Sequence, residues 1–245
     1  MSTQKMQKSF ENKLFIRTIL KPDVVVLSGI KEVDCLLGGF KAGEISFIDG
    51  DSDIISKMPD QICVNTYRTF KSDVIYLDSG ICTNPYRIAQ YARKMEVDQK
   101  ETLGHVRISR AFTVHQLTSI LQETLEPIIK KHKPQTLIIG RFPILYLDSD
   151  VSSSESQTLL KKNIEKIREL TKKYNLITIF TNIDKKMVAN NRNVRSILYD
   201  FVDEILLFKD MELSTRVQLV KKQKGATILK LEEGQMQLQE FGMVI

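Results

Sequence analysis

The stretch that decides the fold is Gly43-Glu-Ile-Ser-Phe-Ile-Asp-Gly-Asp-Ser-Asp-Ile-Ile-Ser-Lys57. It begins as an alternating strand, with Ile45 and Phe47 on one face, and continues into a short polar loop. A helical pattern follows from about Pro59. Strand, polar loop and helix in this order are the layout of a phosphate-binding loop, in which backbone amides at a helix N-terminus hold phosphate groups.

The residues that such a loop uses for chemistry are altered here. A working loop needs glycines for close backbone approach, a lysine for the phosphates and a hydroxyl for magnesium. Gly50 fits the first glycine, but Ile55 falls where the second belongs. Ser56 stands at the lysine position and Lys57 at the hydroxyl position. The layout of the loop is therefore present without its usual side chains.

Three carboxylates, those of Asp49, Asp51 and Asp53, lie in the same loop. Like charges repel at this separation, and no residue pattern nearby indicates a metal site that would offset them. We therefore expect ATP with magnesium to bind weakly or not at all, and we predict no cofactor and no metal site.

Composition and charge set the broad class. The 245 residues suit one domain of generous size, and 42% hydrophobic with 27% charged residues is ordinary for a globular protein. A net charge of +6 permits a nucleic-acid partner without requiring one. Cys35, Cys63 and Cys82 lack metal-ligand spacing, which indicates reduced thiols. With no signal peptide and no apolar run able to cross a bilayer, we expect a cytoplasmic protein with no membrane partner.

Two regions are predicted: an N-terminal arm over residues 1–20 and a core over residues 21–245. The arm is polar and rich in lysine, with an apolar patch at residues 14–16, and is either frayed or docked on a neighbouring subunit. The core opens with a short strand at Val24–Leu27. Ser28 is predicted to cap a short helix that ends at Gly38-Gly39.

The residues at the start of the core resemble those of a known family. Ser28-Gly-Ile, Val33-Asp, Leu36-Leu-Gly-Gly and Gly43-Glu-Ile resemble the start of the core domain of RecA/RadA-type recombinases. In particular the chain is similar to the archaeal RadA paralogs of the RadB kind, which lack the helical N-terminal domain. The resemblance covers residues 24–242. It implies a RecA-like α/β fold, with a mainly parallel twisted sheet, helices on both faces and a C-terminal antiparallel extension.

Two further family motifs are altered at their working residues. In the family, the strand matching Val74–Asp78 is followed by a glutamate that polarises the attacking water, and Gly80 stands there. We expect Asp78 instead to cap the next helix. Nucleoside triphosphatases end the strand matching Thr136–Gly140 in an aspartate that orients a magnesium-bound water, and this chain has Gly140 followed by Arg141. Three altered motifs predict that no catalytic residues remain.

Asn182 keeps the resemblance at the last parallel strand. The pair Thr181-Asn182 matches a Thr-Asn pair of recombinases, but Ile183 replaces the glutamine that follows it and relays nucleotide state to DNA. Right-handed crossovers should bring Gly50, Asp78, Gly140 and Asn182 together at the carboxyl ends of adjacent strands.

Two loops correspond to the DNA-binding loops of recombinases. The first, residues 147–157, is acidic and should hold DNA poorly, because phosphate contacts supply much of the affinity. The second is either an exposed loop or a weak, sequence-tolerant DNA contact through four basic residues: Lys185, Lys186, Arg192 and Arg195. A helix from about Gln157 to Tyr174 carries lysines on its outer face, which is most often only a solvated surface.

The chain should end in antiparallel strands at about 202–208, 215–221 and 227–231, with a further strand possible at 235–241. The function favoured by these observations is a non-catalytic recombinase paralog. It would act as an accessory scaffold in recombination or repair, binding a RadA-type recombinase or another paralog and weakly binding DNA. The alternatives are a divergent ATPase that keeps nucleotide binding through Lys57, and a DNA-binding protein acting alone.

Overall fold

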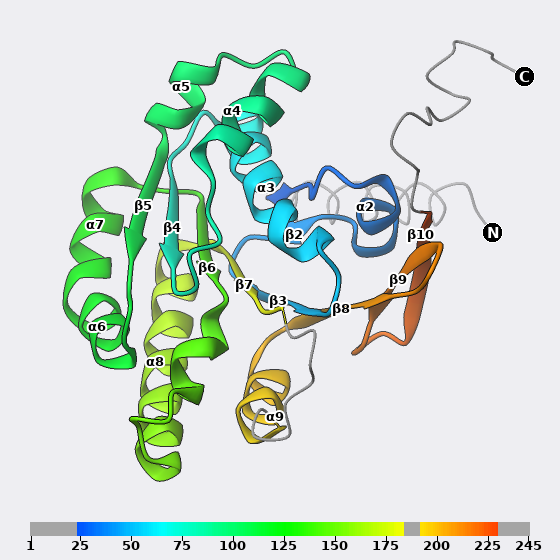
Figure 1. Cartoon of the computed structure of the whole chain (residues 1–245). Coiled ribbons are helices and arrows are strands. Elements are labelled where there is room, and N and C mark those ends of the chain that lie inside the picture. The colour runs from blue at the N-terminus through cyan, green and yellow to red at the C-terminus, as the bar shows by residue number, and fades with distance from the viewer. Residues whose placement is uncertain (1–23, 184–191, 230–245) are drawn as a thin grey trace, which may run out of the picture.

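The computed structural model of the chain describes residues 24–183 and 192–229, and its main element is an eight-stranded sheet (Figure 1). The strands are β3 (Ile45–Gly50), β4 (Val74–Asp78), β5 (Val106–Arg110), β6 (Thr136–Gly140), β7 (Ile177–Thr181), β8 (Glu204–Asp210), β9 (Ser214–Leu219) and β10 (Lys224–Leu229). Their order across the sheet is β10-β9-β8-β3-β7-β6-β4-β5.

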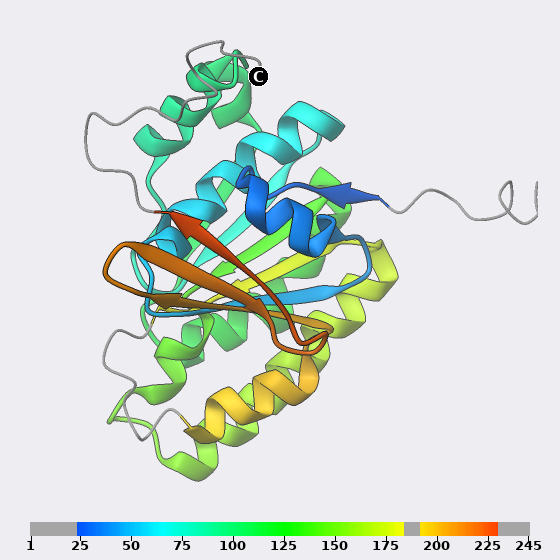
Figure 2. The same ribbon diagram turned by 90° about the vertical axis from the view of Figure 1, so that its right-hand side faces the viewer.

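The sheet is parallel from β8 to β5 and antiparallel from β8 to β10. Four of the parallel strands, β3, β4, β6 and β7, are buried at every residue, which is why they read as continuous apolar runs. In the β9–β10 hairpin, by contrast, β10 alternates between exposed and partly buried residues. The RecA-like fold with a C-terminal antiparallel extension is therefore confirmed, and Figure 2 shows this hairpin at the sheet's edge.

Helices cover both faces of the sheet (Figure 1). On one face lie α2 (Lys31–Leu37), α3 (Ile54–Phe70), α4 (Pro85–Lys94) and α5 (Gln99–Gly104). On the other face lie α6 (Val114–Ser119), a π-helical turn (Ile120–Thr124), α7 (Leu125–His132), a 3₁₀ segment (Phe142–Leu147), α8 (Ser153–Tyr174) and α9 (Arg192–Phe201). A small two-stranded sheet, β1 (Val25–Val26) with β2 (Phe40–Lys41), flanks α2.

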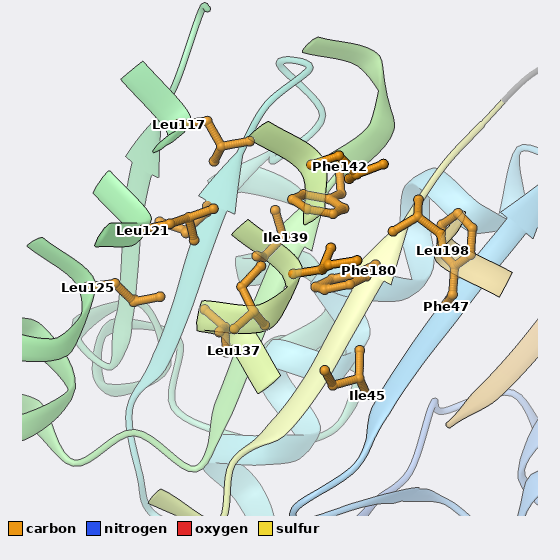
Figure 3. Close-up of a cluster of buried hydrophobic side chains, with 14 of the residues drawn as sticks. Ile45, Phe47, Leu117, Leu121, Leu125, Leu137, Ile139, Phe142, Phe180 and Leu198 are labelled. Atoms are coloured by element: carbon orange, nitrogen blue, oxygen red, sulfur yellow. The ribbon is translucent and has the colours of Figure 1, made fainter. Parts of the chain in front are cut away.

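Successive residues of each central strand supply different cores, because side chains alternate across a sheet. Ile45 and Phe47 of β3 enter the core under α6 to α9, whereas Ile48 enters the core under α2 to α4. Figure 3 shows the first of these cores, in which Phe142 stacks on Phe180 with ring centroids 4.5 Å apart. Both faces of the sheet are thus covered by apolar cores, and the polar side chains of the candidate site lie at the strand ends.

Several predicted boundaries were wrong. Helix α3 begins at Ile54 rather than near Pro59, which lies inside the helix and has no N–H to donate. Helix α8 begins at Ser153, where the Ser152 side chain caps it by accepting a hydrogen bond from the Glu155 amide, so the acidic loop is shorter than predicted. The predicted arm and the possible strand at 235–241 lie outside the described residues.

Two capping predictions were also wrong. Ser28 does not cap α2; the Asp34 carboxylate instead accepts hydrogen bonds from the Ser28 amide and hydroxyl, at 2.7 and 2.8 Å. Asp78 does not cap α4. Helix α4 is capped by Asn84, whose side chain accepts hydrogen bonds from the Tyr86 and Arg87 amides. Gly38 ends α2 in the left-handed conformation, as its position predicted.

Candidate functional site

The four strand ends predicted to meet do so at one edge of the sheet, which we call the carboxyl edge. Gly50 ends β3, Asp78 ends β4 and Gly140 ends β6, while Asn182 directly follows β7. Asp78 pairs with Gly140 across β4 and β6, and the Asn182 amide donates to the Ile48 carbonyl of β3 at 2.9 Å. The nucleotide site of the family would lie at this edge.

The loop between β3 and α3 uses its own backbone amides. Gly50 donates to its neighbour Asp49, and Asp51 donates to the Phe208 carbonyl of β8. Three more amides, those of residues 54, 55 and 56, donate to the Ser52 hydroxyl, the Ser52 carbonyl and the Asp53 carbonyl. A phosphate cradle needs such amides to point at the ligand. Here five of them are already bound within the protein.

Gly50 is fixed by contact with the neighbouring strand rather than by a ligand. It has φ of 140°, and a Cβ added there would lie 1.8 Å from the Phe208 carbonyl oxygen. Only glycine allows β3 and β8 to approach this closely. The glycine that resembles the start of a phosphate loop therefore serves strand packing.

Asp49 is the centre of a buried polar cluster, which we call the Asp49 cluster. Its side chain is fully buried, and its carboxylate accepts from Asn182 at 2.9 Å and from the Tyr199 hydroxyl at 2.8 Å. The Arg195 guanidinium completes the set, with Nε 2.7 Å and Nη2 3.1 Å from the two carboxylate oxygens. These contacts tie the end of β3 to β7 and α9.

The repulsion expected among the three aspartates of the loop is offset in the structure. The charge of Asp49 is balanced by Arg195, and the Asp51 carboxylate points back to accept from the Asp210 amide at 2.7 Å. Burial, and then the Asp49 charge, raise the pKa of Tyr199, so its hydroxyl stays a donor at neutral pH. Of the three aspartates, only Asp53 is exposed.

Asp78 holds the turn that follows β4. It accepts hydrogen bonds from the Cys82, Thr83 and Gly80 amides at 3.0 to 3.2 Å. Burial alone would raise the pKa of Asp78, but these hydrogen bonds outweigh it and lower the pKa. The carboxylate is therefore ionised and bound by the backbone of the turn that follows it.

Gly80 and Gly140, the glycines predicted to stand in place of family carboxylates, are closely packed by other side chains. A Cβ at Gly140 would lie 2.6 Å from the Cys82 sulphur and 2.9 Å from the Tyr76 ring. A Cβ at Gly80 would lie 2.4 Å from the Arg141 side chain. Burial raises the pKa of Cys82 to about 12, so the thiol is protonated at neutral pH. Neither glycine leaves room for an acidic side chain without rearrangement.

A second buried ion pair lies directly beneath the loop. Asp60 of α3 is fully buried and is paired with Arg87 of α4. Arg87 also donates to the carbonyls of Ser56 and Cys82, at 2.8 and 3.0 Å. Burial raises the pKa of Asp60 to about 6, with Arg87 acting in the opposite direction. Arg87 thereby fixes the first turn of α3 to the turn after β4.

A pocket of about 460 Å³ lies beside the start of α3. The exposed Lys57 lines it, but so do the carboxylates of Asp53 and Asp210. The Ser56 hydroxyl donates to the Asp53 carbonyl of the preceding turn at 2.8 Å rather than pointing into the loop. The pocket is thus lined by one lysine and two aspartates, which is a poor match for a polyphosphate.

The predicted DNA-binding residues are only partly described. Lys185 and Lys186 lie outside the described residues, and Arg192 is the first residue of α9. Arg195 is turned inward to Asp49, with 19% of its side chain exposed. The acidic loop and the start of α9 line a further pocket of about 540 Å³. The described residues that line it include Asp148, Asn193 and several serines, and none of these described residues is basic.

Three parts of the site were not predicted from the sequence. Helix α9 was not predicted, although Val194, Leu198 and Phe201 follow helical spacing and Val194 and Leu198 are buried. The role of Tyr199 was not predicted, because its contact with Asp49 joins residues 150 positions apart. No local pattern carries that information. The Arg87–Asp60 pair was missed for the same reason.

The described residues, 24–183 and 192–229, lack two kinds of feature. No helix there is long and apolar enough to cross a membrane. No group of three or more His, Cys, Asp or Glu side chains there is placed to hold a metal ion.

Comparison with known families agrees with the topology. The sequence model of the Rad51 family matches residues 21–233, which include every strand of the sheet and the whole carboxyl edge. This chain therefore belongs to the Rad51 family, within the RecA/RadA-type recombinases.

Proposed function

We propose that this chain is a recombinase paralog that does not hydrolyse ATP and acts as a scaffold in homologous recombination or DNA repair. Its partner would be a RadA-type recombinase or another paralog. The chain itself would be a RadB-like paralog, the type that the motifs at the start of its core resemble. Family membership supports a role in recombination or repair. The finer role is argued from the site, because one fold hosts many functions.

The observation that carries the proposal is the internal use of the loop amides. A phosphoryl-transfer site works almost entirely by positioning and charge stabilisation, so it depends on free amides, a lysine and magnesium-binding groups. Here the amides of Gly50 and Asp51 and of residues 54–56 are bound within the protein. The residues at the carboxyl edge therefore do not fit ATP with magnesium.

The first test is a turnover assay with purified protein, with and without DNA. The expected result is no magnesium-dependent hydrolysis above background, and no difference between the parent and Lys57→Ala. Hydrolysis that is abolished by Lys57→Ala would instead support the alternative of a divergent ATPase. That alternative has one feature in its favour, the position of Lys57 in the pocket beside α3. Calorimetric titration with ATP and magnesium separates binding from turnover.

The second test addresses the scaffold role directly. The purified chain is mixed with the RadA-type recombinase of the same cell and analysed by size-exclusion chromatography with light scattering. A complex of defined stoichiometry is expected, together with a change in strand-exchange rate. Absence of a complex with that recombinase and with every other paralog of the cell would contradict the proposal.

A weaker, sequence-tolerant DNA contact through residues 185–195 is part of the same proposal. Its basic side chains would act as phosphate neutralisers, since no aromatic residue precedes Tyr199 there. Arg195 is engaged by Asp49, so Lys185, Lys186 and Arg192 would carry most of the effect. Replacing all four basic residues by alanine should flatten the salt dependence by up to about 3 units of slope for single-stranded DNA. An unchanged slope would remove this contact from the proposal.

A further inference from the structure

The ends of three helices converge at the opposite edge of the sheet, where the parallel strands begin, which we call the amino edge. Helix α3 ends at Phe70, α7 at His132 and α8 at Tyr174. The segments after them are joined by hydrogen bonds: the Ser72 hydroxyl donates to the Lys133 carbonyl at 3.2 Å, and the Gln135 side chain donates to the Asn175 carbonyl at 3.3 Å. The three helix ends therefore form one continuous surface.

This surface is strongly basic. Seven exposed basic residues lie in the last turns of the three helices or directly after them: Arg68, Lys71, Lys130, Lys131, Lys133, Lys172 and Lys173. The two most buried carboxylates nearby are already neutralised. Asp73 contacts His105, Arg107 and His132, while Glu126 contacts Lys130, Lys166 and Lys173. Within the described part of the chain, Lys131, Lys133 and Lys172 have no carboxylate partner.

Cations near a helix C-terminus stabilise the helix dipole, and this accounts for part of the pattern. It does not account for lysine at the residues that end the helices. Lys71 and Lys133 have φ of 51° and 46°, the left-handed conformation that glycine or asparagine normally adopts there. Asn175 at the end of α8 follows the rule. Lys133 in addition precedes Pro134, so its conformation is restricted twice.

We infer that the amino edge is a binding surface for the phosphate backbone of duplex DNA. Basic side chains on three helix ends are arranged to neutralise phosphates, and a lysine is kept where a smaller residue would relieve backbone strain. A duplex fits better than a single strand, because single strands bind through stacking on exposed aromatic rings. The aromatic rings here are engaged: Tyr67 stacks on His105 beneath Lys71, and the Tyr174 hydroxyl donates to Glu126.

The surface is separate from the acidic loop at the other end of α8. Helix α8 has 22 residues, so its C-terminal end lies about 30 Å from the acidic loop at its start. Figure 1 shows α7 and α8 side by side on one face of the sheet. The start of α9 lies beside the acidic loop, and its last residue, Phe201, packs against Arg168 of α8. The amino edge is therefore distinct from the carboxyl edge.

The test compares two triple variants of the full chain by fluorescence anisotropy with a labelled duplex, across a salt series. The first variant is Lys131→Gln with Lys133→Gly and Lys172→Gln. It should reduce the slope of log affinity against log salt concentration by about 2.7. The loss of affinity between 50 and 200 mM salt should therefore be about 40-fold smaller than in the parent. The control, Lys31→Gln with Lys94→Gln and Lys224→Gln, makes the same charge change at exposed positions elsewhere and should leave the slope almost unchanged.

A single variant separates binding from a purely structural role. Glycine adopts the left-handed conformation of residue 133 without strain. The Tm of the Lys133→Gly variant should therefore rise by about 2–4 °C, while its affinity for duplex DNA falls. A fall in Tm with unchanged affinity would mean that Lys133 only stabilises α7. Equal losses in the two triple variants, or no duplex binding by the parent at 50 mM salt, would overturn the inference.

Discussion

Two carboxylates in this molecule each bind several side chains, but in opposite surroundings. Asp49, at the carboxyl edge, is fully buried and joins β3 to Asn182, Arg195 and Tyr199. Glu126, between α7 and α8, has 19% of its side chain exposed and is bound by Lys130, Lys166, Lys173 and Tyr174. The partly exposed cluster has four side-chain partners and the buried one has three, yet water partly screens the charges of the former.

The difference teaches that burial, rather than the number of ion pairs, decides what a charge cluster does. A buried carboxylate that loses its cation keeps a desolvated charge, which is costly, whereas an exposed one is solvated by water. The carboxyl edge is therefore held rigidly by charges turned inward. In the α7–α8 region the Glu126 carboxylate and its lysines lie partly at the surface, where water screens their charges.

The sharpest test of this comparison is the Arg87–Asp60 pair, where the buried carboxylate has a single side-chain partner. Arg87→Met should destabilise the fold by about 3–5 kcal/mol at neutral pH, because Asp60 is then buried without a cation and two carbonyls lose a donor. Urea unfolding monitored by circular dichroism measures it. The double variant Asp60→Asn with Arg87→Met should recover part of the loss. A loss below about 1 kcal/mol would break the comparison.

The Asp49 cluster should respond less strongly to the same kind of change. Arg195→Met leaves Asp49 with donors from Asn182, Tyr199 and the Gly50 amide, so a loss of about 2–3 kcal/mol is expected. Lys209→Met, at an exposed position of β8, serves as the matched control and should change stability little. Equal effects of the two variants would show that Arg195 contributes only as a surface residue.

The pH dependence of Asp60 gives an intermediate effect. Its pKa of about 6 lies above the value of 3.8 for an unperturbed aspartate, so the native state binds the proton more tightly than the unfolded state. Stability from this group is therefore greatest at low pH and is lost as pH rises through about 6. Between pH 5 and pH 7 the parent should lose about 1–2 kcal/mol relative to Asp60→Asn. An identical pH dependence in the two proteins would contradict the raised pKa.

The smallest effect is expected at Glu126. Hydrogen bonds from Lys173, Tyr174 and Lys166 lower its pKa to about 2, from an ordinary 4.5. Its contribution is thus present above about pH 4.5 and is lost as pH falls toward 2. Glu126→Gln should lower the Tm less than Arg195→Met at neutral pH and should remove that acid dependence. Thermal unfolding at pH 3 and pH 7 checks both points, and a loss matching that of Arg195→Met would reverse the comparison.

Much of the architecture could be predicted from local sequence patterns. Continuous apolar runs at 74–78, 136–140 and 177–181 are central parallel strands, because both faces of these strands are covered. The altered residues Ile55, Gly80 and Gly140 were visible without any structure. Helix limits were less secure: α3 begins at Ile54 and α8 at Ser153, about five and four residues before their predicted starts, because capping and packing override the local pattern.

The chain by itself thus determined the RecA-like fold, the order of its elements and the residue types at the positions that resemble family motifs, among them Ile55, Gly80 and Gly140. These are local properties, set by residue type and spacing. Only the tertiary structure decided which side chains surround those positions. Asp49 meets Arg195 and Tyr199 across about 150 positions, and Arg141 fills the space beside Gly80. The convergence of three lysine-bearing helix ends was likewise decided there, because contacts between distant segments depend on how the whole sheet brings them together.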